Sequence, residues 1–153
     1  MPNLRSILSV ATVGLFLSAC GGSDSPTDPG NNNNGGDGGG TATRTIKSDP
    51  SFASDIFEVL QRRGCTASSC HGGGAGGLFL TSASGAYTNL VGVESNATGE
   101  VFVIASDAAN SYLVKKLEGT ASAGAQMPLG GTALDNIDLT NIKNWITQGA
   151  KNN

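Results

Sequence analysis

"CTASSCH", residues 65–71, brings together two of the three cysteines of this 153-residue chain and its only histidine. The apolar pattern before it ends at Gly64, and a glycine-rich run, "HGGGAGG", begins at His71. Thiols and an imidazole this close together can hold a metal-containing group, or the thiols can form a disulfide in an oxidising compartment. The chemistry of the stretch therefore depends on where the chain resides.

The N-terminus predicts export. Residues 1–20, "MPNLRSILSVATVGLFLSAC", carry one charge, then an apolar run, then small residues before Cys20. This is the layout of a secretory signal peptide, and the apolar run is too short for a membrane span. The ending "LSAC" resembles the lipobox of bacterial lipoproteins, which implies that residues 1–19 are removed and that Cys20 is lipidated; an ordinary signal peptide is the alternative. We therefore expect an extracytoplasmic protein, lipid-anchored at the periplasmic face or the cell surface.

The remainder divides into a linker and one domain. After Cys20, residues 21–43 contain hardly an apolar side chain, so we expect the segment 20–43 to be a disordered linker. Residues 44–153 have the length of one small domain. Eight Lys and Arg stand against nine Asp and Glu in it. A nearly neutral domain has no basic stripe, so nucleic acid is not an expected partner.

The first helical pattern lies in "SDPSFASDIFEVLQRRG", residues 48–64. Ser48 or Asp49 is the expected cap, Pro50 falls in the first turn, and Gly64 ends the helix. Its expected apolar stripe consists of Phe52, Ile56, Val59 and Leu60.

Two further helices are expected. In "SDAANSYLVKKLEG", residues 106–119, Asp107 is the expected cap and Gly119 the stop; Tyr112, Leu113 and Leu117 share a face. In "LDNIDLTNIKNWITQGA", residues 134–150, Asp135 is the expected cap and Asp138 completes a pattern resembling a capping box. The expected stripe of this last helix is Leu139, Ile142, Trp145 and Ile146, before Gly149. The stretch "EVFVIAS", residues 100–106, could form a strand, but the fold class we predict is all-α with long glycine-containing loops.

The motif at residues 65–71 is a longer form of the C-x-x-C-H pattern that attaches haem c. In that pattern two thiols add to the vinyl groups of the macrocycle, and the histidine ligates iron. Here the spacing is C-x4-C-H, so Cys65 forms its thioether in a strained loop or forms none. Met127, in "GAQMPLGG", is the only methionine besides Met1, and methionine is a common partner of histidine on haem iron.

The domain as a whole resembles the small class I-like cytochrome c domains of bacterial lipoproteins and secreted proteins. The matching stretches are "IFEVLQRRGCTASSCHGGGAGGLFL", "AYTNLVGVES", "SDAANSYLVKKLEG", "MPLGGTALD" and "IKNWITQGAKN", within residues 48–152. The resemblance implies one covalent haem c per chain, with Cys65 and Cys70 as thioether attachments, His71 as proximal ligand and Met127 as distal ligand. It implies an electron carrier between extracytoplasmic redox proteins rather than an enzyme.

Other kinds of site that these residues could form each require a group that the stretch does not supply. A structural zinc site needs a fourth ligand, blue copper needs a second histidine, and a hydrolase needs a histidine free to act as base. A phosphate-binding loop would need Lys-Ser or Lys-Thr after the glycines. The alternative that stays open is a Cys65–Cys70 disulfide in a haem-free binding or interaction module.

Overall fold

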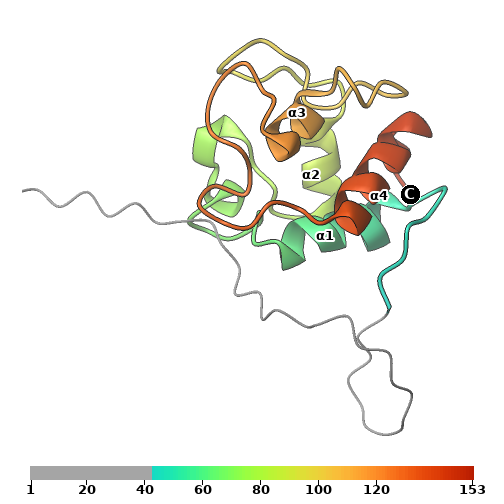
Figure 1. The fold of residues 1–153 in the computed structure, drawn as a ribbon. Coiled ribbons are helices and arrows are strands. Elements are labelled where there is room, and N and C mark those ends of the chain that lie inside the picture. The colour runs from blue at the N-terminus through green and yellow to red at the C-terminus, as the bar shows by residue number, and fades with distance from the viewer. Residues whose placement is uncertain (1–42) are drawn as a thin grey trace, which may run out of the picture.

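Four α-helices form most of the regular structure in residues 43–153, the part of the chain that the computed structural model describes (Figure 1). They are α1 (Phe57–Arg62), α2 (Ala83–Leu90), α3 (Tyr112–Glu118) and α4 (Asn136–Thr147). A π-helical turn, Phe52–Ile56, runs directly into α1, and two 3₁₀ turns, His71–Gly73 and Ala75–Gly77, follow it. The expected signal peptide, Cys20 and nearly all of the expected linker fall in residues 1–42, outside the described residues.

The all-α prediction is confirmed for residues 43–153, which contain no strand. The stretch at residues 100–106 makes only isolated bridges, such as Val91 with Val103 and Glu94 with Val101. Its apolar residues serve the core instead, since Val103 is fully buried. The strand interpretation of this stretch was therefore wrong. None of the helices in the described range has the length and apolar character needed to cross a bilayer.

The first helix begins later than the sequence predicts. Its N-cap is Ser51, not Ser48 or Asp49, and the helix starts at Phe52. The Asp55 carboxylate accepts a hydrogen bond from the Ser51 backbone N–H at 2.9 Å, so a side chain inside the first turn satisfies a group at the helix end. The expected apolar stripe is confirmed: all four of its residues are buried.

The third helix is shorter at its start than predicted. Asp107 caps a separate turn by accepting from the Asn110 backbone N–H at 3.1 Å, and α3 begins only at Tyr112. The Ser111 hydroxyl, at the N-cap, donates to the Asp107 carbonyl at 2.7 Å instead of capping the helix. The predicted stop at Gly119 is confirmed, because this residue adopts the left-handed conformation with φ of 74°.

The last helix agrees best with its sequence pattern. Asp135 is the N-cap, and its carboxylate accepts from the Asp138 backbone N–H at 3.0 Å. Of its predicted stripe, Ile142, Trp145 and Ile146 are buried and Leu139 is half-buried. The capping box is incomplete, however, because the Asp138 carboxylate accepts from arginines and not from the Asp135 backbone N–H.

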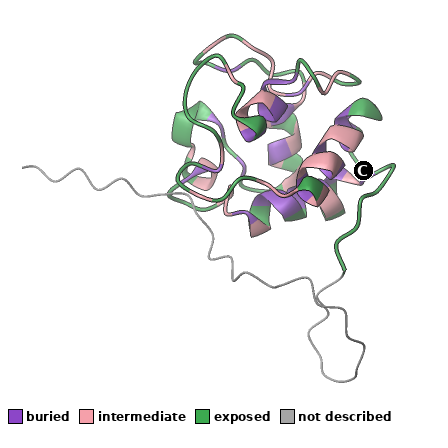
Figure 2. Ribbon diagram, in the orientation of Figure 1, coloured by how far each residue is buried: buried purple, intermediate pink, exposed green. Residues whose placement is uncertain are grey.

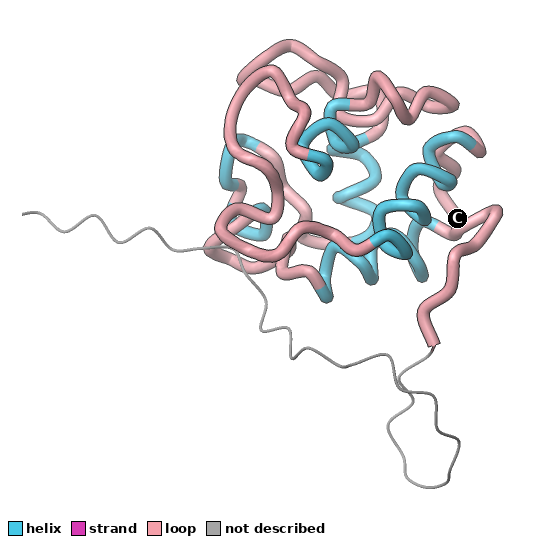
Figure 3. The backbone as a smooth tube through the Cα atoms, in the orientation of Figure 1, coloured by secondary structure: helices cyan, strands magenta, loops and turns pink. Residues whose placement is uncertain are grey.

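An aromatic cluster joins the helices in the core. The Phe52 ring lies 4.9 Å from that of Trp145 and 5.3 Å from that of Tyr87, measured between centroids. These residues come from the start of the first helix, from α4 and from α2, and the buried residues in Figure 2 lie where these elements meet. Long loops connect α2 to α3 and α3 to α4 (Figure 3).

Candidate functional site

The Cys65–His71 loop is folded back on itself by backbone hydrogen bonds. The His71 N–H donates to the Cys65 carbonyl at 3.0 Å, and the Gly72 N–H donates to the Ala67 carbonyl at 3.0 Å. A Cβ atom on Gly72 would lie 2.1 Å from the Thr66 carbonyl oxygen. Only glycine fits against this loop, so the glycines after the histidine are a steric requirement of the longer spacing.

The imidazole of His71 is oriented by the next turn. Its Nδ1 lies 2.9 Å from the carbonyl oxygen of Ala75. A carbonyl can only accept, so Nδ1 carries the proton, and in the neutral ring Nε2 keeps its lone pair. A histidine ligand commonly donates its other ring N–H to a backbone carbonyl in this way. His71 is thus prepared to ligate a metal through Nε2.

Met127 lies on the loop between α3 and α4. Its backbone N–H donates to the Lys116 carbonyl at 2.9 Å, and its peptide bond to Pro128 is cis. The side chain is partly buried and packs against the core.

Cys65, His71 and Met127 line one cavity of about 200 Å³. The helical part of its wall comes from α1 and α3, and the rest comes from loops on both sides of α3. Apolar side chains dominate the lining; they are Leu60, Leu78, Leu80, Phe102, Leu113 and Leu117. The structure therefore places a thiol, an imidazole and a thioether, from distant parts of the sequence, around a mostly apolar space.

Cys65 and Cys70 occupy different environments. Cys65 is a free thiol, and burial raises its pKa to about 11, so it is protonated at neutral pH. Cys70 is 2 % exposed, does not line the cavity and is disulfide-bonded. Of the four residues predicted to hold haem, three meet at the cavity and Cys70 does not. The alternative Cys65–Cys70 disulfide is not formed.

The cavity also includes residues that no motif marks. Tyr112 and Lys116 lie one turn apart on α3 and both contribute to the lining. The Tyr112 hydroxyl donates to the carbonyl of Ala123 at 3.2 Å, which links α3 to the loop that carries Met127. The sequence contained one signal for these two residues. Tyr112 belongs to the face predicted for Tyr112, Leu113 and Leu117, and Lys116 lies on the same side because it stands four residues after Tyr112.

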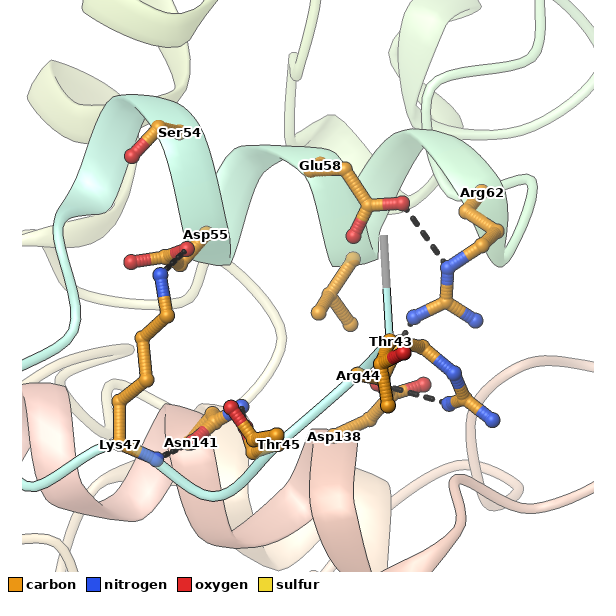
Figure 4. Close-up of a pocket in the computed structure, with 11 residues that line it drawn as sticks. Thr43, Arg44, Thr45, Lys47, Ser54, Asp55, Glu58, Arg62, Asp138 and Asn141 are labelled. Atoms are coloured by element: carbon orange, nitrogen blue, oxygen red, sulfur yellow. Dashed lines mark hydrogen bonds and ion pairs between the residues drawn. The ribbon is translucent and has the colours of Figure 1, made fainter. Parts of the chain in front are cut away.

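A more polar cavity of about 460 Å³ lies between residues 43–47, the first helix and α4 (Figure 4). Asp138 is 1 % exposed, and its Oδ1 accepts from Arg62 at 2.7 Å and from Arg44 at 3.2 Å. Its Oδ2 has no hydrogen-bond partner in the described part of the chain.

Hydrogen bonds at this polar cavity hold residues 43–47 on α4. The Asn141 side chain accepts from the Lys47 N–H at 2.8 Å and donates to the Thr45 carbonyl at 2.9 Å. Lys47 also pairs with Asp55 of the first helix (Figure 4). Cations and carboxylates here are paired with one another, so this cavity offers no excess of either charge to a ligand.

Comparisons with known protein families, with curated proteins and with solved structures found no match to this chain. Among residues 43–153, no three His, Cys, Asp or Glu side chains are grouped as a metal site would require.

Proposed function

We propose that this protein is a c-type cytochrome that binds one haem per chain and transfers single electrons between extracytoplasmic redox proteins. One observation carries the proposal: the only histidine and the only methionine besides Met1 line the same apolar cavity, together with a free cysteine. A disulfide-stapled module with no cofactor has no need to bring these three side chains together.

The side chains at the cavity have the chemistry that a haem requires. Haem iron, when bound, would alternate between its ferrous and ferric states and so carry one electron. His71 would ligate through Nε2, because its Nδ1–H is held by the Ala75 carbonyl. Met127 would supply a thioether, which favours ferrous iron and raises the reduction potential. The apolar side chains would exclude water from the cavity. With no bond of a substrate made or broken, the protein is not an enzyme in this proposal.

Attachment would differ between the two cysteines. Cys65 would hold the macrocycle through a thioether, which the addition of its S–H to a vinyl group would supply. Cys70 would need a free thiol, and its side chain would need to turn toward the cavity. Cys65 is therefore the better-placed attachment in this structure, and a Cys70 thioether would require a local rearrangement.

The fold in this proposal is a small cytochrome c-like one. The cavity of about 200 Å³ is smaller than common ligand pockets, which measure roughly 300–1,000 Å³. The cavity would therefore have to widen to admit a macrocycle, and loops rather than α-helices form most of its wall.

We place the protein on the outside of the cytoplasmic membrane, lipid-anchored through Cys20. The support is the "LSAC" ending after a short apolar run. A Cys20→Ala variant of the full chain should lose membrane association in cell fractionation or remain as an uncleaved precursor. Processing and partitioning like the parent would refute the anchor while leaving the haem proposal intact.

The deciding experiment is spectroscopy of the full chain produced in a host competent for cytochrome c maturation. We expect a haemochrome spectrum that survives acid–acetone extraction, and an intact mass increased by one haem. The Cys65→Ser, Cys70→Ser variant should lose the covalent haem. A colourless wild-type protein would instead support the haem-free interaction module.

The same preparation tests the sixth ligand. Met127→Ala should lose the weak charge-transfer band at the red end of the ferric spectrum and should have a lower midpoint potential, because the thioether is gone. Leu129→Ala is the matched control: Leu129 lies in the same loop, is 40 % exposed and does not line the haem cavity. An unchanged spectrum and potential in Met127→Ala would assign the sixth position to another group.

A further inference from the structure

The side chain of Lys116 holds the segment that leads into Met127. Its ammonium donates to the Ala123 carbonyl at 3.2 Å and to the Ala125 carbonyl, while the Lys116 backbone carbonyl accepts from the Met127 N–H at 2.9 Å. The side chain and backbone of Lys116 thus bind every second residue of the loop from Ala123 to Met127. No other Lys or Arg among the described residues lines the haem cavity.

Gly124 makes this arrangement possible. Its φ of 73° lies in the left-handed region, which turns the carbonyls on either side toward the same ammonium. A Cβ atom on Gly124 would lie only 2.9 Å from Lys116 Nζ. The neighbouring Gln126 adds one contact, since its Nε2 donates to the Leu117 carbonyl at 2.8 Å. The loop is therefore bound along the last turn of α3 by backbone and side-chain hydrogen bonds.

We propose that Lys116 is a positioning residue that holds Met127 at the cavity, and that it thereby controls whether the thioether ligates haem iron. The proposal rests on the proposed function for its effect on iron. The hold on the loop itself is a property of the polypeptide and can be measured without haem.

Lys116 also brings a positive charge to an apolar cavity. A cation near the iron disfavours the ferric state, so the charge raises the reduction potential independently of its hold on the loop. Three substitutions separate the two effects. Lys116→Arg keeps charge and donors, Lys116→Gln keeps a donor without charge, and Lys116→Leu removes both.

In the haem-loaded full chain, Lys116→Leu should lose most of the charge-transfer band that reports methionine ligation and should bind added imidazole more tightly in the ferric state. Lys116→Arg should restore the band and the weak imidazole binding. Lys116→Gln should keep part of the band while its midpoint potential falls. Lys143→Leu is the control: Lys143 pairs with Glu118 and does not line the cavity, so band and potential should stay as in the wild type.

In the haem-free full chain, hydrogen exchange measures the hold directly. The Met127 amide should exchange about 10- to 100-fold faster in Lys116→Leu than in the wild type, because charge-assisted hydrogen bonds are lost. The Val114 amide of the same helix should be unchanged. Wild-type exchange at Met127 in Lys116→Leu would overturn the proposal, as would an intact ligation band. A wild-type chain that never takes up haem refutes the proposed function and the effect on iron. Hydrogen exchange in the haem-free chain then still tests whether Lys116 holds the Met127 loop.

Discussion

At the scale of single residues, the two cysteines of the motif have opposite chemical states. Cys65 is a free, partly buried thiol, whereas Cys70 is disulfide-bonded. Burial favours the neutral thiol of Cys65 over the thiolate and raises its pKa from 9.0 to about 11. The folded state thus binds this proton more tightly than the unfolded state does. The stability contributed is complete below about pH 9 and is lost as pH rises through about 11.

We predict from this pKa that Cys65 reacts slowly with iodoacetamide in the folded, haem-free protein. The thiolate is the nucleophile, and at pH 8 its fraction should be about 100-fold lower than in an unfolded cysteine. Alkylation followed by intact mass should be at least that much slower in native buffer than in guanidinium. Equal rates in the two solvents would contradict the burial of the thiol.

At the scale of elements, the turn after His71 depends on the absence of side chains. A Cβ atom on Gly73 would lie 2.0 Å from the Ser68 carbonyl oxygen, which is backbone and cannot rotate away. The longer C-x4-C-H loop is accommodated because the carbonyl oxygens of Thr66, Ala67 and Ser68, three of its four spacer residues, lie directly against the two glycines. The C-x4-C-H spacing and the glycines after His71 therefore depend on each other.

Gly73→Ala is expected to lower the free energy of unfolding by about 2–4 kcal/mol, because the loop over residues 65–71 must be displaced. Denaturant unfolding followed by the fluorescence of Trp145, the only tryptophan, measures the change. Gly92→Ala is the control: its φ of 73° is strained for alanine, at about 1 kcal/mol, but nothing lies within 4 Å of the added Cβ. Equal losses in the two variants would show that the packing against Ser68 does not matter.

At the scale of the whole molecule, the last residues close the domain. The Trp145 indole N–H donates to the Lys151 carbonyl at 2.9 Å, and the backbone N–H of Phe52 donates to the Asn153 side chain at 2.9 Å. The Ala53 N–H and the Ser51 hydroxyl donate to the Asn153 carbonyl at 2.9 and 2.7 Å. The C-terminal tail thus satisfies the free N–H groups at the start of the first helix.

Deletion of residues 151–153 should therefore lower the free energy of unfolding by about 2–5 kcal/mol, because it leaves a buried indole N–H and the helix start without acceptors. Lys151→Ala is the matched control. It removes only the exposed ion pair with Asp49 and should cost less than about 1 kcal/mol. Chemical denaturation of both variants measures the difference. A deletion no more harmful than Lys151→Ala would show that water replaces these bonds without loss.

Local signals explain which parts of the fold were predictable from the sequence. The Asp135 cap and the Gly119 stop depend on contacts within one turn of a helix, and both were predicted. The start of the first helix was misplaced because Asp55 and the C-terminal tail, rather than Asp49, satisfy its N–H groups. The Asp107 cap failed because Ser111 and Asn110 use that turn for their own hydrogen bonds.

The sequence by itself determined the helical class, the apolar stripes and the identity of Cys65, His71 and Met127 as candidate ligands, because residue type and spacing along the chain carry that information. Only the tertiary structure decided that Cys65 rather than Cys70 lines the cavity, that Asp138 pairs with Arg62 across two helices, and that Lys116 holds the Met127 loop. These facts depend on contacts between elements that are packed together in space. A pattern along the chain does not report them, because neighbouring residues place their side chains on different faces.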